Sequence, residues 1–267
     1  MATMAFSAAQ IAAPRTFVFT ARLFLKEIQY EFLKLLRTRS FSLAVIGFPV
    51  MFYIFLGLAN HTDPSGIDVS KYLLAGYACS GMISAALYGV GVGMASERAA
   101  GWLELKRASP MPPVAYLVAK CITAQAFGVI VVAVLLLLNL AVGHAHLTPL
   151  ESLLLLLMPL AAAVPFAAMG LFIALIVPPN AASGIVNLIY MPMAVMSGLW
   201  IPLSMLPHWL RAIAPALPAY HLSQITLHIF GYQNSSSYPM HWLGLIGFML
   251  LMLGGSWAAF HRAEQNG

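Results

Sequence analysis

The chain has 267 residues, of which 61% are apolar and only 8% are charged, with a formal net charge of +5. Soluble domains carry about 25% charged residues, so this composition excludes a soluble globular protein and indicates an all-α, polytopic membrane protein. The apolar runs are long and do not alternate with polar residues, which excludes a membrane-spanning β-barrel. The two cysteines, Cys79 and Cys121, fall in predicted membrane spans and are expected to be free thiols.

The N-terminal region divides into a tail and an amphipathic segment. Arg15 interrupts the apolar character of residues 1–20, so they do not resemble a cleavable signal peptide and are expected to form a cytoplasmic tail. Residues 21–39 predict a helix with one apolar stripe, in which Glu31 can pair with Lys34. The stripe consists of Leu25, Ile28, Phe32, Leu35 and Leu36. Basic residues favour a position at the membrane interface, and a solvated helix beside the membrane is the alternative.

Residues 40–260 predict a transmembrane domain of six helices, since a bilayer core about 30 Å thick needs roughly 20 apolar residues for each span. The expected spans are 41–59, 72–95, 114–142, 152–177, 182–200 and 240–260. Pro49 is expected to kink the first span, and the small pair Gly89 and Gly93 permits close helix contact in the second. The apolar segment 201–239 is broken by Pro202, Pro207, Pro215 and Pro218, which favours short re-entrant helices in the outer half of the bilayer.

The basic residues give the expected orientation, because cytoplasmic loops of membrane proteins carry an excess of Lys and Arg. With the N-terminus in the cytoplasm, all 13 Lys and Arg residues except Lys71 and Arg211 fall on the inner side. Six spans then place both termini in the cytoplasm, including a C-terminal tail of residues 261–267.

The predicted cytoplasmic loop 96–113 is the only charge-dense loop within the predicted membrane domain. The residues singled out there are Glu97, Arg98, Gly101, Trp102, Leu103, Glu104 and Arg107. Their spacing predicts a helix, with Leu103 and Arg107 four residues apart on one face. An exposed helix that combines mixed charge with large apolar side chains suits docking into a groove on a soluble partner. The alternative is a solvated helix that only sets the topology.

Two motifs in this chain resemble those of the type-2 ABC exporter permeases. The first match comprises Glu97, Arg98, Gly101, Leu103, Glu104, Ser109, Pro110 and Lys120. The second comprises Ser197, Gly198, Pro202, Pro207, Trp209, Leu210 and Pro218. Trp102, Lys106 and Ala119 depart from the family pattern. With the amphipathic N-terminal helix and the six-span layout, the resemblance covers nearly the whole chain.

The resemblance implies a permease subunit in a bacterial inner membrane. The loop at Glu97–Arg107 would be the coupling helix on an ABC ATP-binding subunit, residues 21–39 the interfacial elbow helix, and residues 201–239 the outer gate. Two copies of the ATP-binding subunit, which carry ATP and Mg, would work with two permease chains, expected to be a homodimer. The expected substrate is a hydrophobic drug or antibiotic, and a polysaccharide or lipid-linked glycan is the alternative.

Missing motifs favour a separate motor. The sequence has no Gly-x-x-x-x-Gly-Lys-[Ser/Thr] phosphate loop, so no ATPase site and no cofactor are expected in this chain. The predicted spans carry no clear ionisable residue for ion coupling, and Glu151 sits only at a span start. A passive channel or a structural membrane subunit remains a further alternative. Nothing in the sequence indicates nucleic acid as a partner.

Histidines on the predicted outer side and serines near apolar helices are the remaining candidates for chemistry. His144 and His146 have the spacing of a metal-ligand pair but lack cysteine ligands nearby, so interfacial loop histidines are the favoured interpretation and no metal is expected. Ser183, Ser197 and Ser204 precede His208 and His221, but no nucleophile-elbow pattern surrounds them. An intramembrane hydrolase is therefore not favoured.

Overall fold

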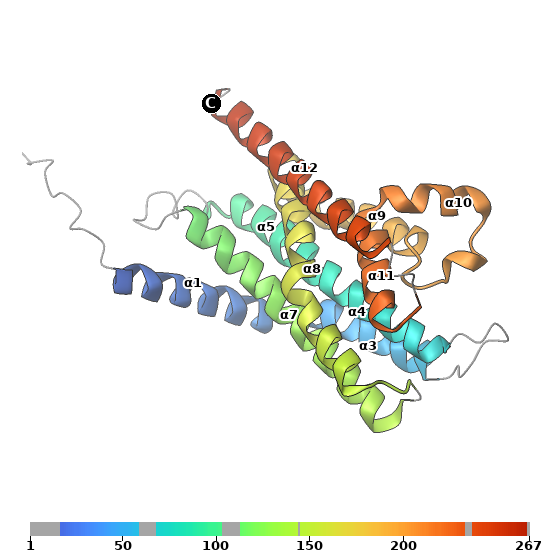
Figure 1. Cartoon of the computed structure of the whole chain (residues 1–267). Coiled ribbons are helices and arrows are strands. Elements are labelled where there is room, and N and C mark those ends of the chain that lie inside the picture. The colour runs from blue at the N-terminus through green and yellow to red at the C-terminus, as the bar shows by residue number, and fades with distance from the viewer. Residues whose placement is uncertain (1–16, 59–67, 103–112, 144, 233–236, 266–267) are drawn as a thin grey trace, which may run out of the picture.

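The computed structural model of the protein describes residues 17–58, 68–102, 113–143, 145–232 and 237–265. These residues form an all-helical bundle, and no strand occurs among them (Figure 1). The helical elements in chain order are α1 (Phe17–Arg37), α2 (Arg39–Ser42), η1 (Leu43–Gly47), α3 (Phe48–Phe52), η2 (Tyr53–Gly57), α4 (Val69–Ala86), η3 (Leu87–Val92), α5 (Gly93–Ala99), α7 (Pro113–Val142), α8 (Pro149–Ile176), η4 (Pro179–Ala181), α9 (Ala182–Met196), η5 (Leu203–Met205), α10 (His208–Ile213), η6 (Ala214–Ala216), α11 (Pro218–Ile229) and α12 (Tyr238–Gln265).

Five helical stretches are long and apolar enough to cross a membrane. They are Arg39–Gly57, Val69–Ala99, Val114–Val142, Pro149–Ile176 and Tyr238–Arg262, and they correspond to the first, second, third, fourth and sixth predicted spans. The fifth predicted span, 182–200, differs from its prediction. Its helix α9 has 15 residues, a length of about 22 Å at 1.5 Å per residue. The helix ends at Met196 because Gly198 adopts a φ of +76°, a left-handed conformation that stops a helix.

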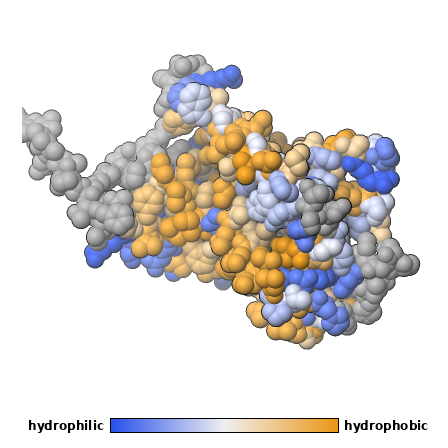
Figure 2. All heavy atoms as spheres, in the orientation of Figure 1, coloured by the Kyte–Doolittle hydropathy of each residue, from blue (hydrophilic) through white to orange (hydrophobic). Residues whose placement is uncertain are grey.

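The second span is the centre of the bundle. In its most apolar stretch 94% of the residues are buried, against 11% in α12, which packs along α8 and α11. Small residues explain the close packing of α4. A Cβ added at Gly81 would lie 2.3 Å from Val131 Cγ1 of α7, and one added at Gly76 would lie 1.7 Å from the Leu199 carbonyl oxygen. The faces turned outward carry apolar side chains over much of the surface (Figure 2), as a lipid-facing surface requires.

The first two spans contain π-helical segments. In the first span, Pro49 lies in α3 between η1 and η2, so the irregularity expected at this proline takes the form of wide helical turns on both sides. In the second span, η3 joins α4 to α5. A Cβ added at Gly91 of η3 would lie 3.2 Å from the Gly170 Cα, so α8 approaches η3 backbone to backbone. Wide turns of this kind are frequent at functional sites.

The two ends of the bundle are held by polar contacts. The end where α4 begins is here called the Lys71 end. There, Lys71 Nζ lies 2.6 Å from Glu151 Oε1 of α8. Glu151 also completes a capping box with Thr148, and Asp68 caps α4. The opposite end, here called the α5 end, contains α1, α5 and the start of α7 (Figure 1).

The region 201–239 consists of short helices, as its prolines predict. Described there are η5, α10, η6 and α11, with Pro218 buried at the start of α11. Helix α11 packs against α4 and α12. Cys79 of α4 is a free thiol, as expected, and lies 3.1 Å from the hydroxyl of Thr226.

Candidate functional site

The helix predicted through Glu97–Arg107 is interrupted at Gly101. Helix α5 ends at Ala99, and Gly101 adopts a φ of +71°, a conformation that costs a non-glycine residue roughly 1–2 kcal/mol. Glu97 and Arg98 therefore belong to the end of the second span rather than to a separate loop helix. Leu103, Glu104, Lys106 and Arg107 lie outside the described residues.

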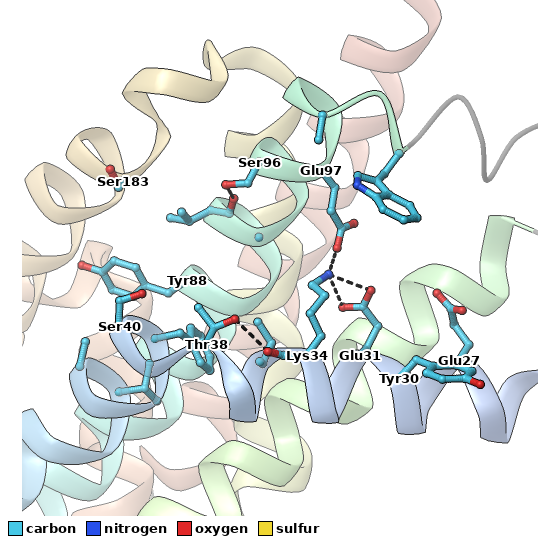
Figure 3. A pocket seen from close by; sticks show the side chains of 18 residues that line it. Glu27, Tyr30, Glu31, Lys34, Thr38, Ser40, Tyr88, Ser96, Glu97 and Ser183 are labelled. Atoms are coloured by element: carbon cyan, nitrogen blue, oxygen red, sulfur yellow. Dashed lines mark hydrogen bonds and ion pairs between the residues drawn. The ribbon is translucent and has the colours of Figure 1, made fainter.

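Glu97 faces the interior of the protein rather than solvent. One carboxylate oxygen lies 3.1 Å from Lys120 Nζ of α7 and also accepts a hydrogen bond from Lys34 of α1, and the other accepts one from the Tyr116 hydroxyl. Lys120 Nζ also lies 3.1 Å from Glu31 Oε2. Four charged side chains thus form a charge cluster, defined by Glu31, Lys34, Glu97 and Lys120, that joins α1, α5 and α7. Figure 3 shows three of them, Glu31, Lys34 and Glu97.

Burial makes this charge cluster energetically significant. Lys120 is 3% exposed and Glu31 is 4% exposed, and such charges are tolerated only when they are paired. The predicted pair of Glu31 with Lys34 is confirmed, with a separation of 3.2 Å. Burial acts to lower the pKa of Lys34, but its hydrogen bond and charge interaction with Glu97, with Glu31 adding to them, outweigh burial and hold that pKa above 10.5. The ammonium group therefore stays charged at neutral pH.

Arg98 joins the same helix to a different neighbour. Its guanidinium donates a hydrogen bond of 3.0 Å to the Leu175 carbonyl and another to the Val177 carbonyl, at the end of α8. The last carbonyls of a helix have no partner within the helix, so Arg98 satisfies two of them. The two adjacent motif residues therefore connect α5 to α1 and α7 on one side, and to α8 on the other.

The residues that follow are directed outward. Trp102 is 57% exposed, and the space around Gly101 is open, since a Cβ added there would meet no atom within 4 Å. Of the motif residues that the structure describes in this loop, Trp102 has the largest side chain available to a partner.

A cavity of about 940 Å³ lies beside the charge cluster. It is lined by α1, α2 and η1 on one side, by η3, α5 and Trp102 on the other, and by Ser183 at the start of α9 (Figure 3). Much of its wall is apolar and comes from Leu35, Phe41, Ala44, Val45, Tyr88 and Val92. Its volume falls in the range of pockets that hold drug-sized molecules.

The second motif forms the turn after α9 and is fixed on α4. The Gly198 carbonyl accepts a hydrogen bond from the Tyr72 hydroxyl, and Trp200 donates one of 2.7 Å to the Ser80 hydroxyl. Ser197 is fully buried beside them. The remaining motif residues are divided between surface and interior: Pro207 and Trp209 are exposed, Pro202 and Leu210 are half-buried, and Pro218 is buried.

A family model described as ABC-2 type transporter matches residues 22–231, which include both motifs. The chain belongs to the ABC-2 type transporter family. It is also similar to a protein of Bacillus subtilis (strain 168) named "Putative transport permease YvfS", with 28% identity over 224 residues that cover 84% of this chain and 91% of that relative. This ABC-2 chain is a multi-pass membrane protein and a permease subunit of an ABC transporter, and the family associates with an ABC ATP-binding subunit.

Sequence reasoning missed the partners of Glu97. Tyr116 was not singled out, and Lys120 was noted only as a motif match, although a lone lysine in an otherwise uncharged helix signals a buried partner. No group of three or more His, Cys, Asp or Glu residues within the described ranges is arranged to hold a metal ion. His144 lies outside those ranges.

Proposed function

We propose that this permease subunit exports a hydrophobic, drug-like or antibiotic-like substrate from the cytoplasm or the inner leaflet, driven by ATP hydrolysis on its partner subunit. The observation that carries the proposal is the cavity of about 940 Å³, lined by the first and second spans and the start of α9. It is largely apolar, and it adjoins the helix end that carries the coupling motif. A polysaccharide would require many more polar groups than these walls offer.

The proposed orientation places the α5 end in the cytoplasm of a bacterial inner membrane. Arg98, Lys120 and Arg262 lie toward this end, as the excess of basic residues on cytoplasmic sides requires. Helix α9, which begins beside α5, would then carry the chain from the cytoplasmic end toward the outer side, and the short helices of 201–239 would lie in the outer half of the bilayer. Helix α12 would return the chain to the inner side, so that both termini stay in the cytoplasm. Interfacial placement of α1 fits its basic last turn, which contains Lys34 and Arg37.

The coupling proposal assigns two roles within the motif. Trp102, together with Leu103, Glu104 and Arg107, would contact the ATP-binding subunit. Glu97 and Arg98 would instead transmit displacement, because their contacts reach α1, α7 and α8. A push on the loop beyond Gly101 would thus move helices on both sides of the cavity.

The outer gate proposal concerns the turn after α9. Ser197 and Gly198 would hold this turn against α4 while Pro202, Pro207 and Trp209 shape the exposed part, and Pro218 begins the helix that returns toward the bundle. Tyr72 of α4 donates a hydrogen bond to the Gly198 carbonyl of the turn, and Trp200 of the turn donates one to Ser80 of α4. These two hydrogen bonds support a turn that moves with the second span.

Two permease chains and two ATP-binding subunits would make the complete exporter. The first span supports this arrangement, because its outward side carries large exposed side chains, among them Met51, Ile54 and Phe55. In a homodimer this side would face the second copy across the substrate path.

The decisive experiment is transport by the purified complex. The tagged chain is isolated with its copurifying ATP-binding subunit and reconstituted, and uptake of drugs or lipid-linked glycans into vesicles is measured with the ATPase facing the bath. The proposal expects ATP-dependent drug uptake that is abolished by vanadate. Transport without ATP would favour a passive channel, and stimulation by glycans alone would overturn the drug assignment.

A matched pair of variants tests the role of the cavity. Ala44→Trp would fill the apolar part of the wall, whereas Gly247→Ala changes α12 at a position with open space around it. The expected result is loss of drug uptake in the first variant and unchanged uptake in the second. Equal transport by both would show that the substrate takes another route.

A further inference from the structure

Helix α1 extends sideways from the bundle at the α5 end (Figure 1), and its outward side carries two rows of side chains. Leu25 and Leu36 are 66% and 44% exposed and lie eleven residues apart, which brings them to nearly the same face of a helix with 3.6 residues per turn. Lys26 and Arg37 are also exposed and have the same separation, so they form a basic row beside the apolar one. Arg22, one turn before Lys26, extends the basic row.

The opposite side of α1 packs against the bundle. Leu35 is buried, and the ring of Phe32 lies 5.3 Å from that of Phe127 of α7, measured between centroids. Glu31 is buried and Glu27 is half-buried, so neither carboxylate of α1 is among its exposed residues. The charged residues that α1 exposes are therefore all basic, and its apolar residues are divided between the bundle and the outward side.

A membrane surface suits the outward side better than water does. The apolar row continues into the first span, where Leu43 is 71% exposed and must be covered by lipid or protein. Within the described ranges, Arg22, Lys26 and Arg37 form no ion pair with a carboxylate. Arg39, with which the first span begins, forms none there either. Basic residues grouped on an amphipathic helix directly beside a span attract anionic lipid headgroups.

The buried side of α1 is joined to the coupling motif. Glu31 Oε2 lies 3.1 Å from Lys120 Nζ, which in turn lies 3.1 Å from Glu97 Oε1. Lys34 of α1 contacts both carboxylates as well. A displacement of α1 would separate these groups, because an ion pair requires its nitrogen and oxygen within about 4 Å of each other. An interaction that fixes α1 on the membrane therefore also fixes Glu97.

We propose that the outward side of α1 binds anionic phospholipid headgroups, with the basic row at the phosphates and the apolar row among the acyl chains, and that this binding holds the charge cluster together. In the proposed orientation these lipids belong to the inner leaflet. The consequence for coupling, that drug-stimulated ATPase activity depends on lipid charge, rests on the proposed function. Binding itself does not, because it requires only the two rows of α1.

Hydrogen exchange of α1 tests the binding. The complete complex is placed in nanodiscs of phosphatidylcholine alone, or of an equal mixture of phosphatidylcholine and phosphatidylglycerol, without nucleotide. We expect the α1 amides to exchange at least about fivefold more slowly in the anionic mixture, the effect of a single Lys or Arg contact with such a surface. Equal exchange in both nanodiscs would overturn the proposal. If inorganic phosphate added to phosphatidylcholine nanodiscs slows exchange equally, the ligand is a free anion and the assignment to lipid is wrong.

Matched variants locate the site. The double variant Lys26→Gln with Arg37→Gln removes two charges of the basic row, and the lipid effect should then fall below about twofold. Lys26→Arg with Arg37→Lys keeps both charges and should retain the effect. Arg211→Gln removes an exposed basic residue of α10 and should retain it too. An undiminished effect in the neutral double variant, in a complex that assembles normally, would refute a site on α1.

Drug-stimulated ATPase activity in the same nanodiscs tests the consequence for coupling. It should be higher in the anionic mixture, and the neutral double variant should lose this difference. If the lipid changes exchange of α1 but not ATPase activity, the binding site stands and its link to coupling is refuted. If ATP-driven drug uptake occurs while exchange of α1 is the same in both lipids, the proposed function stands and the lipid site is wrong.

Discussion

Lys120 Nζ of α7 lies 3.1 Å from Glu97 Oε1 of α5 and equally 3.1 Å from Glu31 Oε2 of α1. One buried ammonium group thus contacts the coupling motif and the N-terminal helix at the same time. The sequence motif predicts a docking surface, but its residue Glu97 takes part in an internal connection between α1, α5 and α7.

Replacing Lys120 by methionine tests this connection. The variant removes one of the two ammonium groups that contact Glu31 and Glu97 among the described residues. Removing one member of a buried pair costs about 3–5 kcal/mol. The expected result is a strongly lowered melting temperature of the purified permease, measured by fluorescence-detected size exclusion after heating.

The control for Lys120→Met is the double variant Lys120→Met with Glu31→Gln, which also removes one of the two carboxylates. Its melting temperature should recover part of the loss, because less negative charge remains buried without a partner. Additive losses in the double variant would mean that Lys120 acts through packing alone.

The general architecture could be predicted from the sequence because it depends on hydropathy. Long apolar runs such as 114–142, whose one charged residue is Lys120, and 152–177, which has no charged residue, cannot form the polar surface of a soluble helix. Their helices α7 and α8 begin and end within three residues of the predicted limits. The fifth span was harder to predict, because hydropathy continues through Leu199 and Trp200 while the backbone turns at Gly198. Mean hydropathy does not depend on the φ of a glycine, so it cannot reveal this turn.

The site was only partly predictable for a different reason. The spacing of Glu97, Gly101 and Glu104 fits a helix face, but periodicity does not reveal that Gly101 has a positive φ and ends α5. The partners of Glu97 are 63 and 23 residues away in the chain, at Lys34 and Lys120. Only the packing of α1 against α7 brings them together, and a sequence pattern contains no information on that distance.

Gly101→Ala is expected to weaken coupling without preventing membrane insertion. A φ of +71° at this position costs alanine roughly 1–2 kcal/mol. The backbone after α5 would therefore adopt another conformation, which would displace Trp102. The measurement is drug-stimulated ATPase activity of the reconstituted complex, which should fall although the permease is present in normal amount.

Two variants separate conformation from size at this position. Gly101→Asn should retain more activity than Gly101→Ala, because asparagine tolerates the left-handed region. Gly184→Ala adds the same methyl group at a helical glycine that likewise has open space around it, and it should leave coupling unchanged. If both alanine variants behave like the unmodified protein, the turn at Gly101 has no part in coupling.

Gly76→Ala is expected to disrupt the contact between the second span and the turn after α9. The added Cβ would lie 1.7 Å from the Leu199 carbonyl oxygen, and forcing extra atoms into a packed interior costs typically 1–3 kcal/mol. Thermal unfolding in detergent should show the loss, while Gly247→Ala, in open space on α12, should keep or slightly raise the melting temperature. A neutral effect of Gly76→Ala would indicate that this turn moves freely away from α4.

The packing of α11 against α12 is expected to depend on pH through two histidines. His221 Nδ1 lies 3.1 Å from His241 Nδ1, so one ring nitrogen donates a hydrogen bond and the other accepts it. Burial lowers the pKa of His221 below its ordinary value of 6.5, and a hydrogen bond with the Pro215 backbone offsets this only in part. The neutral form is therefore favoured in the packed state. The stabilising contact is fully present above about pH 6.5 and is lost as the pH falls through the lowered pKa.

Hydrogen exchange of α11 at pH 7.5 and pH 5 measures this effect, with rates corrected for the intrinsic dependence on pH. Protection should fall at pH 5, because protonation of both rings would place two positive charges within 3.1 Å. His241→Phe should remove most of the dependence on pH, since no second charge can then form beside His221. His208→Gln, at an exposed histidine of α10, should leave it unchanged. Equal protection of α11 at both pH values would show that α11 and α12 are held together by their apolar contacts alone.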